Sequence, residues 1–339
     1  MSETLSVVVP VFNERESLPL FHERLLAVLD GLALGVEILY VDDGSSDGSG
    51  AWLDDARAAD SRIAVLRLSR NFGKEAAVSA GLDHATGDAV VVIDADLQDP
   101  PELIPTLVGH WREGFDVVYA LRDSRDGESW LKRSSAALFY RLMDRLSDVP
   151  IPRDTGDYRL LSRRAVAALG KLREQHRYMK GLYAWIGYPQ KAVRYAREVR
   201  AGGRSKWSYW RLWNLALEGI TSFSAAPLKL ATLLGMITSI GAFGYGLYFL
   251  LRTLFFGNPV PGYPSLVVII LFLGGVQLVC LGIIGEYLAR TYNESKGRQL
   301  YFVMDYLPSA STGAPHDTDS PTAVSTHAQD QSRDASDDS

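Results

Sequence analysis

The sequence contains only one cysteine, Cys280, in 339 residues. A single cysteine excludes a disulfide framework within the chain and a metal site built from several cysteines. The usual glycine-rich phosphate loops are also absent, since no G-x-G-x-x-G follows the first β-rich run and no G-x-x-x-x-G-K occurs. If the ligand is a nucleotide, its diphosphate must therefore be neutralised by another device.

Charged side chains are missing from two long stretches, residues 230–251 and 253–285, which are separated by Arg252. A stretch of about 22 apolar residues at 1.5 Å per residue reaches roughly 33 Å, which is enough to cross the hydrocarbon core of a bilayer. Three prolines between residues 259 and 264 indicate a turn between the two stretches. We therefore predict a hairpin of two transmembrane helices over residues 229–251 and 264–285, with Cys280 as an inert packing residue in the second.

Basic residues flank this hairpin on both sides, whereas the connecting loop contains only Arg252. The positive-inside rule then places both ends of the hairpin in the cytoplasm. The membrane that the hairpin crosses is expected to be the inner (plasma) membrane. We expect no signal peptide before the first β-rich run, because the start of the chain is too polar. Residues 308–339 contain six Asp and one Arg among many Ser, Thr and Ala, a composition typical of disorder.

Before about residue 200 the chain alternates β-rich runs with helical patterns. The β-rich runs cover residues 5–12, 36–43, 63–69, 89–96 and 115–121, and helical patterns cover residues 17–32 and 74–87. Alternation of this kind predicts an open, mainly parallel α/β sheet with helices on its faces. The continuous Val and Ile runs are typical of strands that are buried on both sides.

Polar residues follow each of the five predicted strands, where an open α/β sheet binds its ligands. They are Asn13 and Glu14, then Asp42, Asp43 and Ser45, then Asn71 and Lys74, then Asp94 and Asp96, and finally Arg122. Any one of these clusters is also explained by ordinary turns and helix caps. All five together favour a binding site along one edge of the sheet.

Asp94 and Asp96 are the strongest candidates for a metal site. The two residues are two positions apart, and in an extended chain side chains at this spacing point to the same side. Mg²⁺ prefers oxygen ligands, takes one or two carboxylates from the protein, and completes its shell with water and substrate phosphate. Asp99 to Glu102, in contrast, fit a turn and a helix start, with proline and an acidic residue in the first turn.

Seven segments, in this order along the chain, carry a resemblance to known enzymes. PVFNE (10–14), VDDGSSDGS (41–49), RNFGKEAA (70–77) and DADLQDPPE (94–102) resemble the family 2 glycosyltransferases with a GT-A fold. DTGDYRLLSRRAV (154–166), HRYMKGLYAWIGY (176–188) and residues 200–224 resemble the polyprenyl-phosphate glycosyltransferases. That group includes the bacterial undecaprenyl-phosphate glucosyltransferases of the GtrB type and dolichol-phosphate mannose synthase.

The resemblance implies six regions. They are a cytoplasmic GT-A catalytic domain (1–200), a juxtamembrane amphipathic region (201–228), the two spans (229–251 and 264–285), a cytoplasmic post-membrane segment (286–307) and a disordered acidic tail (308–339). It also implies inverting transfer of a hexose from a nucleotide sugar to a membrane polyprenyl phosphate, with glucose from UDP-glucose as the first expectation. The implied partners are these two substrates, the membrane and further copies of the chain, as a homo-oligomer and by resemblance a tetramer, but no nucleic acid.

The same resemblance assigns residues to the donor. Mg²⁺ or Mn²⁺ would be held by Asp94 and Asp96, with Gln98 as the third family position. The nucleotide sugar would contact Pro10, Val11, Asn13, Glu14, Asp42, Asp43, Lys74, Asp94, Ala95 and Asp96. One of Asp42 and Asp43 would face the base or ribose and the other would be a turn acceptor, and the sequence does not distinguish them.

The acceptor is an anion, so it needs cations close to the bilayer. Arg122, Arg125, Lys132, Arg204 and Lys206 are the candidates for binding its phosphate, although basic residues near a membrane commonly serve anionic lipids and topology alone. Asp157 is placed near the reacting centre by the resemblance, together with Arg122. Because a phosphate monoester is largely dianionic at neutral pH, Asp157 is either a general base or an orienting group.

Several alternatives stay open at this point. The aromatic segment from Trp207 to Ile220 is typical of an interfacial helix, but packing against the catalytic domain also explains it. Mannose, an N-acetylhexosamine or a formylated aminoarabinose are possible sugars in place of glucose. A processive synthase is disfavoured, because QHRYM (175–179) does not match its Q-x-x-R-W motif. From another class, the chain could be an inactive membrane scaffold.

Overall fold

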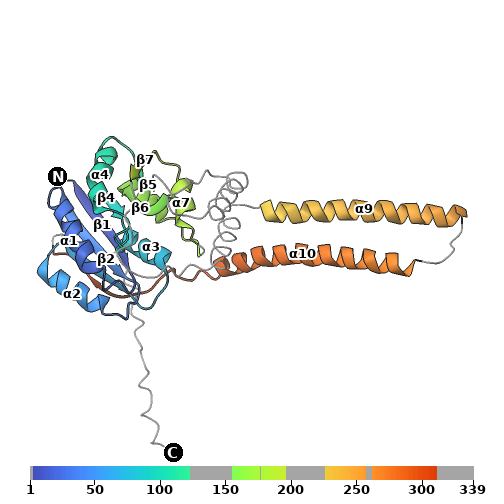
Figure 1. Cartoon of the computed structure of the whole chain (residues 1–339), viewed down its shortest axis with the longest axis horizontal. Helices are drawn as coiled ribbons and strands as arrows, with labels where there is room; N and C mark the ends of the chain where they lie inside the picture. Colours follow the sequence, from blue (N-terminus) through green and yellow to red (C-terminus); the bar gives the residue numbers. More distant parts are fainter. Residues whose placement is uncertain (1–2, 123–154, 176, 196–225, 257–261, 311–339) are drawn as a thin grey trace, which may run out of the picture.

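The computed structural model describes residues 3–122, 155–175, 177–195, 226–256 and 262–310. A sheet of eight strands lies at one end of the molecule, and a long helical hairpin extends away from it (Figure 1). The strands are β1 (Thr4–Val11), β2 (Gly35–Asp42), β3 (Ile63–Leu68), β4 (Ala89–Val92), β5 (Val117–Arg122), β6 (Thr155–Ser162), β7 (Gln190–Tyr195) and β8 (Val303–Leu307). Their order in the sheet is β7-β5-β6-β4-β1-β2-β3-β8.

Helices cover both faces of the sheet. They are α1 (Leu18–Leu29), α2 (Ser49–Ala59), α3 (Lys74–His84), the short 3-10 helix η1 (Pro101–Leu103), α4 (Ile104–Arg112), α6 (Arg163–Leu169) and α7 (Met179–Trp185). Side chains of α1, α2 and α4 form one hydrophobic core, and those of α3, α6 and α7 form a second. Along β1, Val7 and Val9 face the first core while Val8 faces the second. The central strands are therefore buried on both sides, which explains their continuous apolar sequence.

The predicted fold class is confirmed: an open α/β sheet is followed by a hairpin of two apolar helices. All five predicted strands form, and β1 pairs in parallel with β2 and β4, as β2 does with β3. Three further strands were not predicted. Of these, β6 runs antiparallel between β4 and β5, β7 forms one edge, and β8 forms the other.

The hairpin consists of α9 (Ala226–Phe256) and α10 (Tyr263–Ser295). Both helices are long and apolar enough to cross a membrane, over residues 231–256 and 268–295. Their large apolar side chains lie exposed, with Phe243 at 76% and Leu278 at 71% of full exposure, which in water would be costly. The predicted spans 229–251 and 264–285 lie within these helices. Cys280 packs between them, with its Sγ 3.4 Å from the carbonyl oxygen of Ala231.

After α10 the chain returns to the sheet, where β8 pairs antiparallel with β3. Arg67 on β3 forms an ion pair with Asp305 on β8 at 3.1 Å, and the Tyr301 hydroxyl donates to Asp83 at the end of α3 at 2.7 Å. The predicted post-membrane segment 286–307 thus consists of the end of α10, up to Ser295, and a return to the sheet that includes β8. This arrangement also requires α9 to start, and α10 to end, on the side of the sheet domain (Figure 1).

The packing of α3 against β1 allows no side chain at Gly81. A Cβ atom there would lie 2.2 Å from Cγ1 of Val8 and 3.1 Å from Cγ2 of Val41. Gly81→Ala is therefore expected to destabilise the protein by about 1–3 kcal/mol through overpacking. The measurement is thermal unfolding of the purified full chain.

Gly109 on α4 provides the matched control, because a Cβ atom there meets nothing within 4 Å. Gly109→Ala is expected to stabilise the protein by up to about 1 kcal/mol, as alanine favours helix over glycine. Equal melting temperatures for the two variants would contradict the close contact between α3 and β1.

Candidate active site

The strand directions gather the predicted polar residues at one edge of the sheet. The carboxyl ends of β1, β2, β3 and β4 share this edge because these strands are parallel. The antiparallel strand β6 begins at the same edge, and its register pairs Arg159 with Val92. This is the last pair of the ladder, and Asp94 and Asp157 each follow it by two positions toward the site edge. The pairing of β4 with β6 therefore places the candidate catalytic residue beside the first candidate metal ligand.

Lys74 joins these two carboxylates. It is the first residue of α3, and its Nζ lies 2.6 Å from Oδ2 of Asp94 and 2.6 Å from Oδ2 of Asp157. Burial raises the pKa of Asp94, against the attraction of Lys74. Burial would also raise the pKa of Asp157, but the charge of Lys74 outweighs it and holds that pKa below its ordinary value. Burial would lower the pKa of Lys74, but the two carboxylates raise it, so the ammonium stays charged.

The loop before Lys74 is fixed by Asp43. This buried carboxylate accepts hydrogen bonds from the backbone N–H groups of Phe72 at 2.7 Å and Gly73 at 2.9 Å. Gly44 makes the approach of the two loops possible, because it has a φ of +74° and a Cβ there would lie 2.9 Å from the backbone of Arg70 and Asn71. Asp43 therefore holds the start of α3 in place.

The first two strand ends are also joined to each other. The backbone N–H of Asn13, which has a φ of 56°, donates to Oγ of Ser45 at 3.0 Å, and the N–H of Glu14 donates to Oγ of Ser49 at 3.1 Å. Asp42 accepts from the N–H of Ser45 at 2.9 Å. Both members of the Asp42–Asp43 pair thus have backbone partners, so the contact of either with a base or ribose stays a prediction.

The candidate donor residues differ in their exposure. Val11 and Ala95 are buried in the core, while Pro10 and Glu14 are half-buried and Asn13 is exposed. The non-glycine residue Leu97 has a φ of 62°, a strained conformation of the kind that collects at functional sites. Next to it, Asp96 is half-buried and accepts a hydrogen bond from the backbone N–H of Gln98 at 3.1 Å.

Asp99 and Glu102 lie where the helix start was expected. Pro101 begins the short helix η1, with Glu102 in its first turn and paired with Arg24 at 2.8 Å. Asp99 also makes a structural contact that was not predicted. It is 2% exposed and accepts a hydrogen bond from the hydroxyl of Tyr195 on β7. Substitution of Asp99 would therefore remove this hydrogen bond between Asp99 and β7.

The oxygen atoms at this edge fit a divalent cation. Asp94, Asp96 and Gln98 offer only oxygen donors, which suit Mg²⁺ or Mn²⁺. Oδ1 of Asp157 is buried and has no hydrogen-bond partner among the described residues, so one acceptor next to Asp94 is unused. Within the same part of the chain, no group of three or more His, Cys, Asp and Glu side chains forms a complete metal site. The residues thus fit a cation whose remaining ligands come from a substrate and water.

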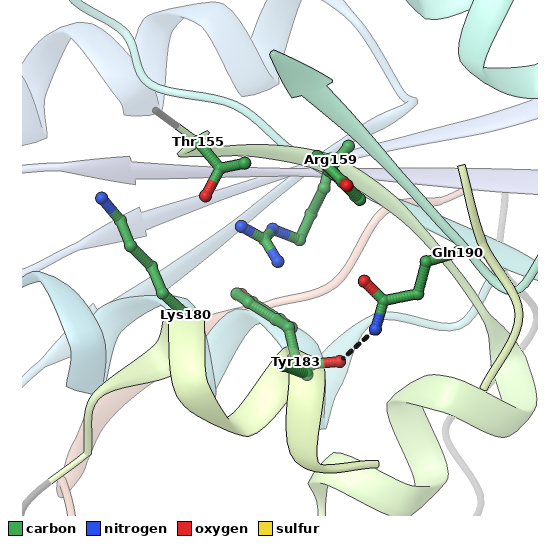
Figure 2. A pocket seen from close by; sticks show the side chains of 7 residues that line it. Thr155, Arg159, Lys180, Tyr183 and Gln190 are labelled. Atoms are coloured by element: carbon green, nitrogen blue, oxygen red, sulfur yellow. Dashed lines mark hydrogen bonds between the residues drawn. The ribbon is translucent and has the colours of Figure 1, made fainter. Parts of the chain in front are cut away.

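A small pocket lies beside β6, where Thr155 and Arg159 line it (Figure 2). It is lined by Tyr119, Thr155, Arg159, Lys180, Tyr183, Ala184 and Gln190. Lys180 extends from α7 toward Thr155, and the guanidinium of Arg159 lies 3.5 Å from the ring centre of Tyr183 while donating to the carbonyl oxygen of Gly156 at 2.7 Å. Arg159 was not predicted, although its position two residues after Asp157 on a strand indicates the same side of the sheet.

Glu75 is a further acidic group that was not predicted. It follows Lys74 on α3, and burial raises its pKa to about 8, with the nearby charge of Asp157 adding to the rise and those of Lys74, Lys180 and Arg159 opposing it. Protonated Glu75 is a hydrogen-bond donor in a region where Asp94 and Asp157 only accept.

The candidate acceptor residues lie mainly outside the described part of the chain. Arg122 is the last residue of β5, in register with Tyr195 on β7. Because β4 and β5 both run antiparallel to β6, which lies between them, the carboxyl end of β5 lies at the same edge as that of β4, and Arg122 ends at the edge that carries the site. Arg125, Lys132, Arg204 and Lys206 fall outside the described residues, so their assignment to the acceptor stays a prediction.

Comparisons with known proteins agree along most of the chain. Residues 6–170 match the model of glycosyl transferase family 2, and residues 226–291 match the GtrB C-terminal hairpin. A glycosyltransferase of Synechocystis sp. is 52% identical, over 91% of this chain and 98% of that protein. A prophage bactoprenol glucosyl transferase homolog of Escherichia coli is 45% identical, over 88% of this chain and 98% of that protein. A glucosyl-3-phosphoglycerate synthase from Mycobacterium tuberculosis, solved with Mn²⁺ and UDP, is similar in structure, with a TM-score of 0.45. The two sequences are 21% identical, over 65% of this chain and 76% of that one.

The raised pKa of Glu75 makes stability depend on pH. Its pKa is about 8 in the folded protein against an ordinary 4.5, so between these values the folded state holds a proton that the unfolded state has lost. Stability from this group is complete below pH 4.5 and is lost as the pH rises toward 8. Glu75→Gln keeps the shape without the titration, so its melting temperature relative to the wild type should rise between pH 5 and pH 8.

Glu16→Gln, which removes a carboxylate at an exposed position, is the control for this measurement. A difference between Glu75→Gln and the wild type that is the same at pH 5 and pH 8 would contradict a protonated Glu75.

Proposed function

The chain belongs to glycosyl transferase family 2, and from this premise we propose that it transfers glucose from UDP-glucose to the phosphate of undecaprenol (bactoprenol), with inversion at the sugar carbon. The observation that carries this proposal is the meeting of Asp94, Lys74 and Asp157 at the edge of a sheet whose chain continues into two helices of membrane-spanning length. The bactoprenol glucosyl transferase homolog, which matches from the catalytic domain through the hairpin, supports the choice of sugar and acceptor.

The donor is proposed to bind with its diphosphate at the ends of β1, β2 and β4. Asp94, Asp96 and Gln98 would hold Mg²⁺ or Mn²⁺, which when bound neutralises the charge that grows on the diphosphate as the glycosidic bond breaks. Asn13, Glu14 and Lys74 face this edge from the neighbouring loops and are proposed to contact the nucleotide. Pro10, Val11 and Ala95 would shape the floor of the site, and one of Asp42 and Asp43 would reach the ribose or base.

Asp157 is proposed to orient the reactants and not to remove a proton. A carboxylate whose pKa is held low by Lys74 is a weak base, and the acceptor phosphate, with a second pKa near 6, is mostly dianionic at neutral pH. Arg122, placed at the end of β5, is proposed to receive the anionic acceptor, with Arg125, Lys132, Arg204 and Lys206 forming the approach from the membrane.

The hairpin gives this reaction its location. We propose that α9 and α10 span the inner membrane with the sheet domain and both chain ends in the cytoplasm, as the positive-inside rule indicates. The return of β8 to the sheet supports a hairpin whose two ends lie on the same side. A homo-oligomer associated through these helices completes the proposal.

The activity is tested by incubating the purified full chain with undecaprenyl phosphate, Mg²⁺ and a panel of radiolabelled nucleotide sugars. We expect a labelled lipid with UDP-glucose. If only another nucleotide sugar gives a labelled lipid, that sugar replaces glucose in the proposal. If no nucleotide sugar gives a labelled lipid, the alternative of an inactive membrane scaffold is supported.

Asp96→Ala tests the metal site within the same assay. Loss of one metal carboxylate is expected to lower the rate about a hundredfold or more, and EDTA to abolish it. Asp55→Ala on the exposed face of α2 removes a carboxylate away from the site and should keep the wild-type rate. Full activity in EDTA would remove the metal from the mechanism.

Asp157→Asn distinguishes an orienting group from a base. We expect a rate lower by about a hundredfold. The rise in rate with pH should keep its midpoint near 6, the second pKa of the acceptor phosphate. If the rate of the variant relative to the wild type is instead reduced mainly below pH 6, where the acceptor phosphate carries a proton, Asp157 acts as a base.

A further inference from the structure

Lys74 occupies the place where the proposed metal site and the catalytic carboxylate meet. Its Nζ makes 2.6 Å contacts with one oxygen of Asp94 and one of Asp157 at the same time. An ammonium at this distance forms charge-assisted hydrogen bonds, which are about twice as strong as neutral ones. Oδ2 of Asp94 is therefore already engaged by a positive charge, and a divalent cation that binds Asp94 must displace that charge or lie against it.

The backbone under Lys74 is held firmly. Asp43 accepts hydrogen bonds from the backbone of the two residues before Lys74. The helix that begins with Lys74, α3, is fixed by its close packing at Gly81 against Val8 and Val41. Only the side chain of Lys74 is free to change its partner, and its side chain is 43% exposed. The lysine can thus leave Asp94 by rotation about its own bonds, without movement of the helix.

The charges of the site favour this exchange only when the donor is present. A divalent cation that enters alone meets the ammonium at close range, and repulsion between like charges in a partly buried site weakens its binding. A nucleotide diphosphate brings negative charge of its own. It supplies new acceptors for the displaced ammonium and further ligands for the cation, so that metal and nucleotide each strengthen the binding of the other.

We propose that Lys74 is an internal cation that holds Asp94 and Asp157 together in the donor-free protein and competes with the divalent metal for Asp94, so that metal binds tightly only together with the nucleotide diphosphate. This inference rests on the proposed function, because it takes Asp94 and Asp96 as the metal ligands. In this scheme Lys74 is a positioning residue before the donor binds and a diphosphate contact afterwards. Asp157 keeps the ammonium as a neighbour throughout.

The test measures Mn²⁺ binding to the full chain in detergent by electron paramagnetic resonance, with and without UDP and without acceptor. Lys74→Met removes the charge and keeps a side chain of similar length. In the absence of UDP, this variant should bind Mn²⁺ about tenfold more tightly than the wild type. UDP should tighten Mn²⁺ binding strongly in the wild type and much less in Lys74→Met.

Two further variants control for charge and folding. Lys74→Arg keeps a positive charge on a long side chain and should bind Mn²⁺ weakly without UDP, as the wild type does. Lys171→Met removes a positive charge at an exposed position after α6 and should also match the wild type. Thermal unfolding of each variant shows whether the fold is retained. If Lys74→Met does not fold, Lys74→Gln, which also removes the positive charge, takes its place in the same measurement.

The outcomes separate this inference from the function on which it rests. If Lys74→Met binds Mn²⁺ without UDP no more tightly than the wild type, Lys74 does not compete with the metal. The same conclusion follows if Lys74→Arg gains as much Mn²⁺ affinity as Lys74→Met. Either result leaves the metal site itself intact. Absence of Mn²⁺ binding in the wild type even with UDP would overturn the metal-dependent function itself, and this inference with it.

Discussion

The antiparallel pairing of β4 with β6 is the constraint on which the candidate site depends. Four residues of β4 pair with four of β6, and the register brings Asp157 close to Asp94 across 63 positions of sequence. Without this ladder, Lys74 would have one carboxylate partner in place of two. The like charges of Asp94 and Asp157 are tolerated in a half-buried position because the ammonium of Lys74 contacts both of them.

The sequence alone predicted the parts of this site that follow from local patterns. Continuous Val and Ile runs predicted β1 to β4, and the polar residues after them predicted the edge where the site lies. The partners of these residues were not predictable in the same way. That Lys74 would bridge Asp94 and Asp157, that Asp43 would hold the loop before α3, and that Asp99 would accept from Tyr195 depend on pairings between distant segments, which no local periodicity encodes.

The new strands show the same limit. In β6, TGDYRLLS begins with polar residues because its first half forms the site, so it lacks the apolar signature of a buried strand. In β8, the five residues VMDYL follow a membrane-length helix and lie at the edge of the sheet, where partly exposed side chains suffice. Yet β8 ties the hairpin to β3, and Tyr301 reaches Asp83 on α3, the helix that begins with Lys74. The apolar hairpin and the candidate donor site are thus joined through one short stretch of chain.

We propose that Asp94, Lys74 and Asp157 form the donor site of this glycosyltransferase and that a metal replaces the ammonium of Lys74 at Asp94. An experimental structure of the full chain with Mn²⁺ and UDP tests this most directly. We expect the metal on Asp94 and Asp96, with Nζ of Lys74 moved from Asp94 to the diphosphate and still close to Asp157. A diphosphate bound elsewhere, or a metal at Asp94 with Lys74 unmoved from the same carboxylate oxygen, would contradict it.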